Sequence, residues 1–447
     1  MLRKYLISGA TIVNEGKAFI GNVLIENGLI ADISTGNTIK PEDAEHIEAK
    51  GKYLLPGVID DQVHFRDPGL THKGDIYTES RAAVAGGVTS YMDMPNTVPN
   101  TLTQELLEEK YKAASEKSLA NYSFYMGVSN DNVEEVLKTD PSKVCGIKIF
   151  LGASTGNMLV DNLTTLEQLF SNSKSLIAVH CEDEPTIREN LNHYRQIYGD
   201  NIPVELHPAI RSNEACLKSS TFAVNLARKY NTRLHVLHLS TAEEMALFST
   251  EPSTAEKRIT AEVCVHHLCF SEQDYHTIGN NIKWNPAIKS ANDRSALMQA
   301  LLDNRIDVIA TDHAPHTREE KQKPYTSCPS GGPLVQHSLT AMLEKVLKKE
   351  ISIELVVEKM CHAPARIFGV ERRGFIRKGY HADLVLINPN APWTVAKENI
   401  LYKCGWSPFE EVTFHSAVTH TFVGGHMAWS NGKFDESVKG SRLSFVH

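Results

Sequence analysis

Five side chains that could bind a metal ion stand in, or directly after, apolar strand-like runs of the sequence. They are His64, Lys148, His180, His238 and Asp312. Imidazole and carboxylate groups are suitable ligands for zinc and similar divalent ions. One such histidine would more often be structural, but four strand ends with His or Asp, plus a lysine inside an apolar strand, favour a shared metal site.

Lys148 lies in the apolar run GIKIF at 146–150, where its side chain should point into a core. Burial disfavours an ammonium ion and favours the neutral, nucleophilic amine. Such an amine can add carbon dioxide and become a carbamate, an anion able to bridge two metal ions. The alternative is a lysine that reaches the rim or pairs with a carboxylate.

Arg66, Asn96 and Asp312 could act on a substrate near these metal ligands. A guanidinium binds a carboxylate through two parallel hydrogen bonds. A carboxylate beside a metal-activated water can act as general acid and base. Asn96 follows Pro95, so by itself it also fits an ordinary turn.

His266 and His267 stand where the seventh strand is expected to end. Adjacent residues of a strand point to opposite faces, so at most one of them can face the site. We therefore interpret both as structural.

Eight apolar runs alternate with amphipathic helical segments, and this pattern predicts a (β/α)₈ barrel. The expected strands are 58–64, 88–94, 122–128, 146–150, 176–180, 234–238, 259–266 and 307–311. The carboxyl ends of barrel strands converge on one face, which would bring the five side chains together. The connection 313–333, rich in Lys, Glu, Pro, Gly and Ser, is typical of a mobile active-site loop.

Short β strands with glycine turns occupy both ends of the chain. Because neither end is long enough for a core of its own, we expect residues 1–56 and 370–447 to form one small β-sandwich domain. Residues 57–369 would then form the metal-dependent barrel.

The overall composition indicates a soluble globular protein. A formal net charge of -8 argues against nucleic acid as a partner, and no apolar run is long enough to span a membrane. The eight cysteines form no CxxC pair, and the N-terminal apolar run is too short for a signal peptide. We expect a cytoplasmic protein with a small-molecule substrate. The sequence is also compatible with a homodimer.

Several segments together resemble the dihydroorotases of the amidohydrolase superfamily, over nearly the whole chain. The segments are VHFRDPG (63–69), DMPNT (93–97), GIKIF (146–150), HVLHLST (235–241), NP (285–286), TDHAPH (311–316), APARIFG (363–369) and HADLV (381–385). Each would be weak evidence alone, whereas the set is highly specific.

The resemblance implies reversible cyclisation of N-carbamoyl-L-aspartate to L-dihydroorotate in pyrimidine biosynthesis. It implies a zinc set of His64, carboxylated Lys148, His180, His238 and Asp312, with Asp312 also as general acid/base. In the hydrolytic direction a metal-bound hydroxide would attack the ring amide. The substrate would be held by Arg66, Asn96, Asn285 and His316.

One position departs from the family pattern. The first strand of the family normally ends His-x-His, and here Gln62 occupies the first of those positions. An amide oxygen is a much poorer zinc ligand than an imidazole nitrogen. We therefore predict one firmly bound zinc ion and a second of lower affinity.

Three alternatives remain at the level of sequence. Allantoinase and dihydropyrimidinase also open cyclic amides, but Arg66 favours a substrate with a free carboxylate. An inactive scaffold for a partner enzyme, such as aspartate transcarbamoylase, is supported only by Gln62. A scaffold has no physical need for the other metal ligands.

Overall fold

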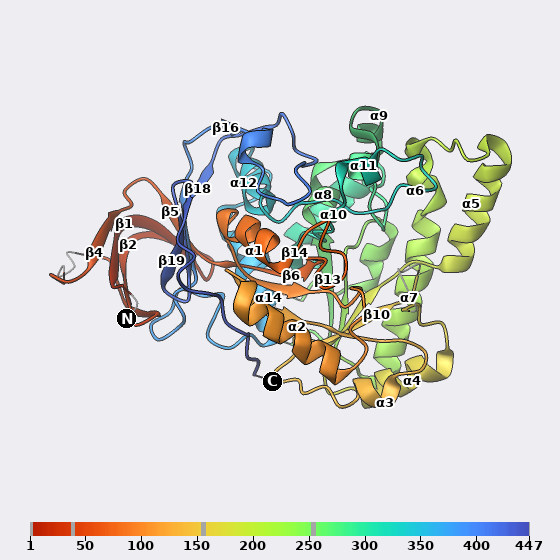
Figure 1. Cartoon of the computed structure of the whole chain (residues 1–447), viewed down its shortest axis with the longest axis horizontal. Helices are drawn as coiled ribbons and strands as arrows, with labels where there is room; N and C mark the ends of the chain where they lie inside the picture. Colours follow the sequence, from red (N-terminus) through yellow and green to blue (C-terminus); the bar gives the residue numbers. More distant parts are fainter. Residues whose placement is uncertain (1–2, 37–40, 153–157, 252–255, 447) are drawn as a thin grey trace.

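The structure is a computed structural model, and it describes residues 3–36, 41–152, 158–251 and 256–446 (Figure 1). It contains a barrel of parallel strands and, beside it, a β domain built from both ends of the chain. Figure 1 shows the first strands and the last strands of the chain lying together on one side of the barrel.

The barrel has the eight strand positions that the sequence predicts. Its strands are β6 (Val58–Val63), β7 (Val88–Asp93), β8 (Asn121–Phe124), β9 (Met126–Gly127), β10 (Ile147–Phe150), β11 (Ile177–His180), β12 (Leu234–Val236), β13 (Ile259–Cys264) and β14 (Val308–Ala310). They pair in parallel in two sheets, β6-β7-β8 and β9-β10-β11-β12-β13-β14. The expected third strand is divided into β8 and β9. The barrel closes between β14 and β6, where His64 N donates to His313 O at 2.7 Å.

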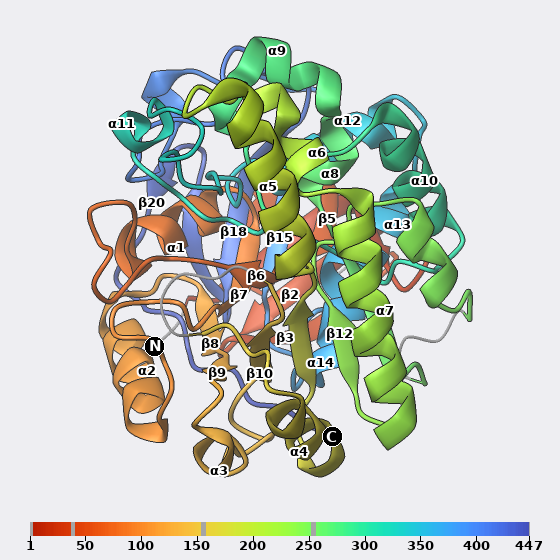
Figure 2. The ribbon, with the colours of Figure 1, turned by 90° about the vertical axis from the view of Figure 1, so that its right-hand side faces the viewer.

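Helices follow the strands and cover the outside of the barrel (Figure 2). They are α1 (Ile76–Ala85), α2 (Gln104–Lys117), α3 (Val133–Val136), α4 (Leu163–Asn172), α5 (Glu184–Tyr198), α6 (His207–Ile210), α7 (Asn213–Tyr230), α8 (Val265–Cys269), α9 (Tyr275–Ile278), α10 (Ala291–Leu302), α11 (Arg318–Lys321), α12 (Ser338–Leu347), α13 (Ile353–Val357) and α14 (Ala363–Phe368). The barrel fold predicted from the alternating pattern is confirmed.

The β domain is a sheet that contains strands from both ends of the chain. Its strands are β1 (Tyr5–Asn14), β2 (Lys17–Glu26), β3 (Leu29–Ser34), β4 (Glu45–Glu48), β5 (Tyr53–Pro56), β15 (Leu384–Asn388), β18 (Ala417–Val423), β19 (His426–Ser430) and β20 (Lys433–Phe434). β5 pairs antiparallel with β15, which joins the two ends. β16 (Trp393–Thr394) and β17 (Thr413–Phe414) form a separate pair. The domain boundaries at residues 56 and 369 stay a prediction.

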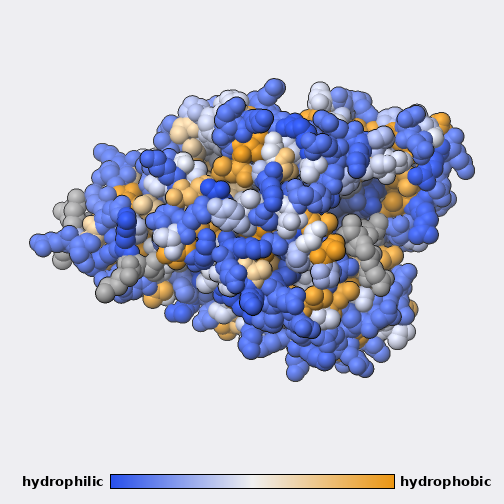
Figure 3. Space-filling model, viewed as in Figure 1, coloured by the Kyte–Doolittle hydropathy of each residue, from blue (hydrophilic) through white to orange (hydrophobic). Residues whose placement is uncertain are grey.

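The described residues include no helix long and apolar enough to cross a membrane. Figure 3 shows a mainly hydrophilic face with apolar residues scattered between polar ones. Such scattered apolar residues are normal on a protein surface.

Asp383 ties the β domain to the barrel. Its carboxylate pairs with the buried Arg373, accepts from Gly424 N at 2.6 Å, and accepts from the Asn121 side chain of β8 at 3.2 Å. Removing one partner of a buried ion pair leaves an uncompensated charge.

We expect Asp383→Ala to lower the free energy of unfolding by about 3–5 kcal/mol, because it leaves Arg373 buried without this carboxylate. Urea denaturation measures the change. Asp32→Ala is the control, since that side chain is 52% exposed and lies 3.9 Å from Lys378, so it should change stability by less than about 1 kcal/mol. Equal effects of the two substitutions would contradict this account.

Candidate metal and substrate site

One cavity of about 310 Å³ at the barrel mouth is lined by every site residue that the sequence predicts. They are His64, Arg66, Asn96, Lys148, His180, His238, Asn285, Asp312 and His316. The parallel arrangement of the strands explains why these residues meet, because it places the ends of strands that are far apart in sequence at one rim of the barrel. The structure therefore brings the whole predicted set together, while the individual roles stay predictions.

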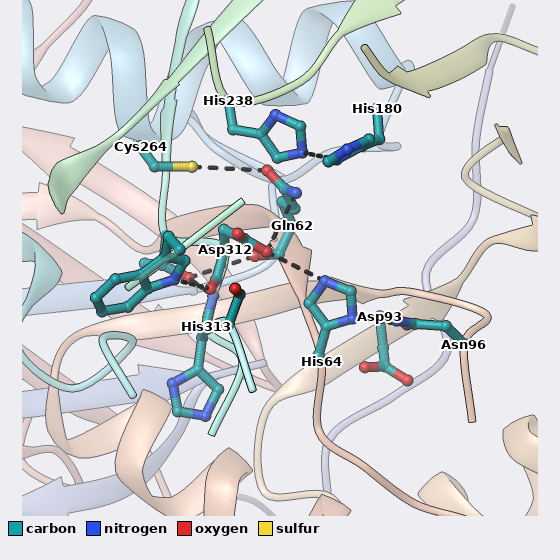
Figure 4. Close-up of polar contacts among 12 residues, drawn as sticks. Gln62, His64, Asp93, Asn96, His180, His238, Cys264, Asp312 and His313 are labelled. Carbon is teal, nitrogen blue, oxygen red and sulfur yellow. Dashed lines mark hydrogen bonds and ion pairs between the residues drawn. The ribbon is translucent and has the colours of Figure 1, made fainter. Parts of the chain in front are cut away.

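His180 and His238 face each other inside this cavity (Figure 4). His180 Nδ1 lies 3.0 Å from His238 Nε2, and His180 Nε2 lies 3.0 Å from a carboxylate oxygen of Glu182. His180 Nδ1 and His238 Nε2 share a hydrogen bond here, and a bound metal ion would take the place of the proton between these two nitrogens. Burial lowers the pKa of both imidazoles, so both are neutral, the form that binds a metal ion.

His64, Gln62 and Asp312 form the other side of the site (Figure 4). His64 Nδ1 lies 2.7 Å from Asn96 Oδ1, which can only accept, so Nδ1 carries the proton. His64 Nε2 then faces Asp312 Oδ1 at 3.1 Å. A lone pair and a carboxylate at that distance fit two ligands of one cation.

Gln62 presents the wrong group for a metal ligand. Its amide NH₂ donates to Asp312 Oδ1 at 3.3 Å, and its oxygen accepts from the Cys264 thiol at 3.6 Å. An imidazole at this position could offer a lone pair, whereas the Gln62 amide directs an N–H donor at the carboxylate. This geometry agrees with the prediction that the second of the two zinc ions is bound with lower affinity.

Lys148 is 1% exposed, and its Nζ lies 4.5 Å from the centre of the Phe150 ring. Burial lowers the pKa of its amine to about 7, although the Asp312 and Glu262 carboxylates oppose the shift. A large fraction of this amine is therefore neutral near pH 7, as carbon dioxide addition requires.

Arg66 and Asn285 offer polar groups to a substrate. The Arg66 guanidinium donates to Pro315 O at 3.1 Å and lies 3.0 Å from His316 Nε2. Burial lowers the pKa of Arg66 to about 10, so it stays positively charged at neutral pH. Asn285 Oδ1 is buried and has no hydrogen-bond partner among the described residues.

Three site residues have a left-handed backbone that non-glycine residues rarely adopt. The φ angles are 68° at Arg66, 40° at His238 and 47° at Asp312. Such conformations persist only where the surrounding structure enforces them, and they gather at functional sites.

Glu182, Arg211 and Trp284 belong to the site, and the sequence did not reveal them. Arg211 and Trp284 line the cavity. Glu182 pairs with Arg211. Burial alone would raise the pKa of the Glu182 carboxyl group. The neighbouring Arg211 and His180 have the larger opposite effect and lower this pKa to about 2. Its position two residues after a predicted ligand was the available signal, since carboxylates commonly orient metal-binding histidines.

The expectation that His266 and His267 point to opposite faces is wrong. Strand β13 ends at Cys264 and helix α8 begins at Val265, so both histidines are helical. Their ring centres lie 4.1 Å apart, and His266 stacks on Trp284.

The 313–333 connection forms one wall of the cavity through Ala314, His316, Pro329, Ser330 and Gly331. The buried Lys321 side chain donates to Pro329 O and Gly331 O of this connection, at 3.0 and 2.8 Å, and to Lys283 O of a neighbouring segment at 3.3 Å. One side chain thus fixes the carbonyl groups beside the substrate wall.

A sequence model of the amidohydrolase family matches residues 53–428, and the chain belongs to this family. The dihydroorotase of Methanosarcina acetivorans is 32% identical over 398 residues, which cover 87% of this chain and 84% of that protein. The dihydroorotase of Pyrococcus furiosus is 30% identical over 439 residues, covering 97% and 96%.

Solved structures of hydantoinases share the fold. The L-hydantoinase (dihydropyrimidinase) of Arthrobacter aurescens is 26% identical, with a TM-score of 0.92 over 99% of this chain and 100% of that chain. The dihydropyrimidinase of Brevibacillus agri is 25% identical, with a TM-score of 0.87 over the same shares. The resemblance predicted from the sequence motifs is confirmed.

We expect Lys321→Met to loosen the 313–333 wall, because three carbonyl groups lose their common donor. Hydrogen exchange of residues 328–332 should accelerate by about tenfold or more, corresponding to about 1–3 kcal/mol. The exposed Lys323 supplies the matched control, Lys323→Met. Unchanged exchange in Lys321→Met would show that this ammonium does not hold the wall.

Proposed function

We propose that this chain is a cytoplasmic dihydroorotase, which interconverts N-carbamoyl-L-aspartate and L-dihydroorotate. The observation that carries the proposal is a buried guanidinium, Arg66, in the same cavity as two pairs of metal-ligand side chains. The relatives named dihydroorotase, at 29–34% identity over most of the chain, support it.

The solved hydantoinases and dihydropyrimidinases suggest the competing substrates, neutral cyclic amides. Arg66 favours dihydroorotate as the substrate, because a buried guanidinium forms its strongest hydrogen bonds with a carboxylate and dihydroorotate carries one. Arg211 is the second guanidinium of the cavity, but Glu182 already pairs with it.

We assign the metal set to His64, Lys148, His180, His238 and Asp312, with zinc as the ion and Lys148 carboxylated. The facing nitrogens of His180 and His238, and the His64–Asp312 pair, fit this group. A bound divalent ion would acidify water and polarise the amide carbonyl of the substrate. Carboxylation joins the neutral Lys148 amine to carbon dioxide and releases one proton.

The remaining steps belong to residues of the chain. In ring opening, Asp312 would take a proton from the attacking water and deliver it to the departing ring nitrogen; cyclisation reverses this and releases water. Trp284 Nε1 donates to Asp312 O at 3.2 Å and helps fix the position of this residue. Arg66 would orient the substrate carboxylate, and Asn96, Asn285 and His316 of the same cavity would make further contacts with the substrate.

An inactive scaffold is the weaker proposal. Gln62 is the feature that favours it, whereas the buried Lys148 and the neutral histidine pair have no use in a scaffold. Buried ionisable groups without a function are unfavourable for stability.

Ring opening of L-dihydroorotate, dihydrouracil, hydantoin and allantoin should be compared with one preparation of metal-loaded protein. We expect the highest kcat/KM for dihydroorotate. Arg66→Ala should lower that value by about 10- to 150-fold, because a charge-assisted contact of about 1.5–3 kcal/mol is lost. Arg188→Ala, on the exposed side of α5, is the control. A preference for a neutral cyclic amide would overturn the assignment.

Gln62→His should strengthen the second metal position. After dialysis, the variant should retain about one equivalent of zinc more than the unmodified protein, because imidazole replaces an amide that donates to Asp312. Elemental analysis measures the difference, and Gln62→Leu, which adds no ligand, is the control. An unchanged zinc content in Gln62→His would contradict the role given to Gln62.

A further inference from the structure

A second group of ionisable side chains lies inside the barrel, separate from the residues that line the cavity. Asp61 of β6, His235 of β12 and Glu262 of β13 are each 0% exposed. His235 Nε2 lies 3.1 Å from Asp61 Oδ2 and 3.6 Å from Glu262 Oε2. The Phe368 ring packs edge-on against His235, with ring centres 5.5 Å apart. We call these three residues the core cluster.

A bulge in β6 explains how Asp61 reaches the interior. Asp60 pairs with Tyr91 and Val63 pairs with Asp93, so two residues of β6 stand opposite one residue of β7. A bulge breaks the strict alternation of faces along a strand. Asp61 can therefore meet His235 while its neighbour Gln62 lines the cavity.

The two ring nitrogens of His235 have different neighbours: Nδ1 contacts Thr260, and Nε2 faces the carboxylates. Thr260 Oγ1 lies 3.3 Å from Leu234 O and 2.7 Å from His235 Nδ1. When the hydroxyl donates to Leu234 O, it accepts from His235 Nδ1–H, and His235 Nε2 directs its lone pair towards Asp61 and Glu262. A lone pair facing two carboxylates is repulsive unless a cation lies between them.

Four polar atoms of the core cluster lack hydrogen-bond partners within the described part of the chain. This applies to both carboxylate oxygens of Asp61, to Glu262 Oε2 and to His235 Nε2. Leaving one buried polar group unsatisfied costs about 1–3 kcal/mol, and more when it is charged. One ligand atom from each of the three residues lies within 4.8 Å of the other two, which indicates a missing common partner.

We propose that Asp61, His235 and Glu262 bind a divalent transition-metal ion, such as zinc, in the core of the barrel. Two ligands of a tetrahedral zinc ion at about 2.0–2.2 Å lie about 3.3–3.6 Å apart, and the separations of 3.1 and 3.6 Å seen here are near that range. One nitrogen and two carboxylate oxygens suit this ion. Its two positive charges would balance the two buried carboxylates.

The rival occupant is a proton on His235. Burial opposes the charged form, but the Asp61 and Glu262 carboxylates raise the pKa of His235 to about 9. The single Nε2 proton of an imidazolium could serve only one of the two carboxylates, Asp61 Oδ2 at 3.1 Å or Glu262 Oε2 at 3.6 Å. This rival also needs a proton on Glu262, since burial and the neighbouring Asp61 raise the pKa of Glu262 to about 7. A divalent ion balances both carboxylates and contacts all three side chains with one occupant, so we favour the metal ion.

The core cluster is connected to the candidate site through Glu262. Glu262 Oε1 accepts the backbone N–H of His238 at 2.9 Å, where the chain has its left-handed turn. A bound ion would join β6, β12 and β13 and hold His238 in place. Because the site is enclosed, the ion would enter during folding and resist chelators afterwards.

Crystals of the unmodified protein, produced with zinc and dialysed against EDTA, test this directly. Diffraction data above and below the zinc absorption edge should show an anomalous peak between the three side chains. A map without that peak, in which His235 Nε2–H bonds one of the carboxylates, would overturn the proposal. The result does not depend on which cyclic amide the protein hydrolyses.

Two variants separate this ion from the one assigned to the cavity. His235→Asn should lose about one equivalent of the EDTA-resistant zinc, whereas His180→Asn should keep it. Elemental analysis is made on samples that unfold cooperatively. Equal EDTA-resistant zinc in His235→Asn and the unmodified protein would contradict the proposal; if His235→Asn does not fold, the crystal result decides.

Discussion

The closure of the barrel between β6 and β14 is the constraint on which the site depends. The Asp60 carboxylate accepts from Thr311 Oγ1 at 2.6 Å, and His64 N donates to His313 O at 2.7 Å. These contacts join segments about 250 residues apart and set His64 and Gln62 against Asp312. Without them the two halves of the metal set would belong to unconnected strand ends.

The chemistry and the substrate preference have different structural origins. Lys148 and His180 lie in barrel strands and His238 follows β12 by two residues, and the fold of these strands is shared with the hydantoinases. Arg66 and its support lie in connections after strands: Arg66 follows β6, and His316 belongs to the wall held by Lys321. A family can therefore change its substrate through these connections while the strands keep the reaction type.

Much of the fold and the site could be predicted from the sequence because parallel barrel strands have a simple signature. Each apolar run that ended in His64, His180 or Asp312 became a strand with its end at the mouth. The bulge in β6 could not be predicted, since it depends on pairing with β7 rather than on local residue preference. The pattern for β13 also continued past the true strand end, where tertiary contacts favour helix α8.

Contacts between side chains of distant segments could also not be predicted from the sequence. The Glu182–Arg211 pair and the three carbonyl groups around Lys321 depend on how loops meet over the barrel. Backbone acceptors carry no residue-specific signal, so only the structure shows why Lys321 is buried.

The most direct test of the account is a crystal structure of the metal-loaded Asp312→Asn variant with L-dihydroorotate. We expect the ligand carboxylate within hydrogen-bonding distance of the Arg66 guanidinium and the ring amide carbonyl directed at His180, His238 and Lys148. A ligand whose carboxylate lies away from Arg66, with its ring amide directed away from these three residues, would contradict the account.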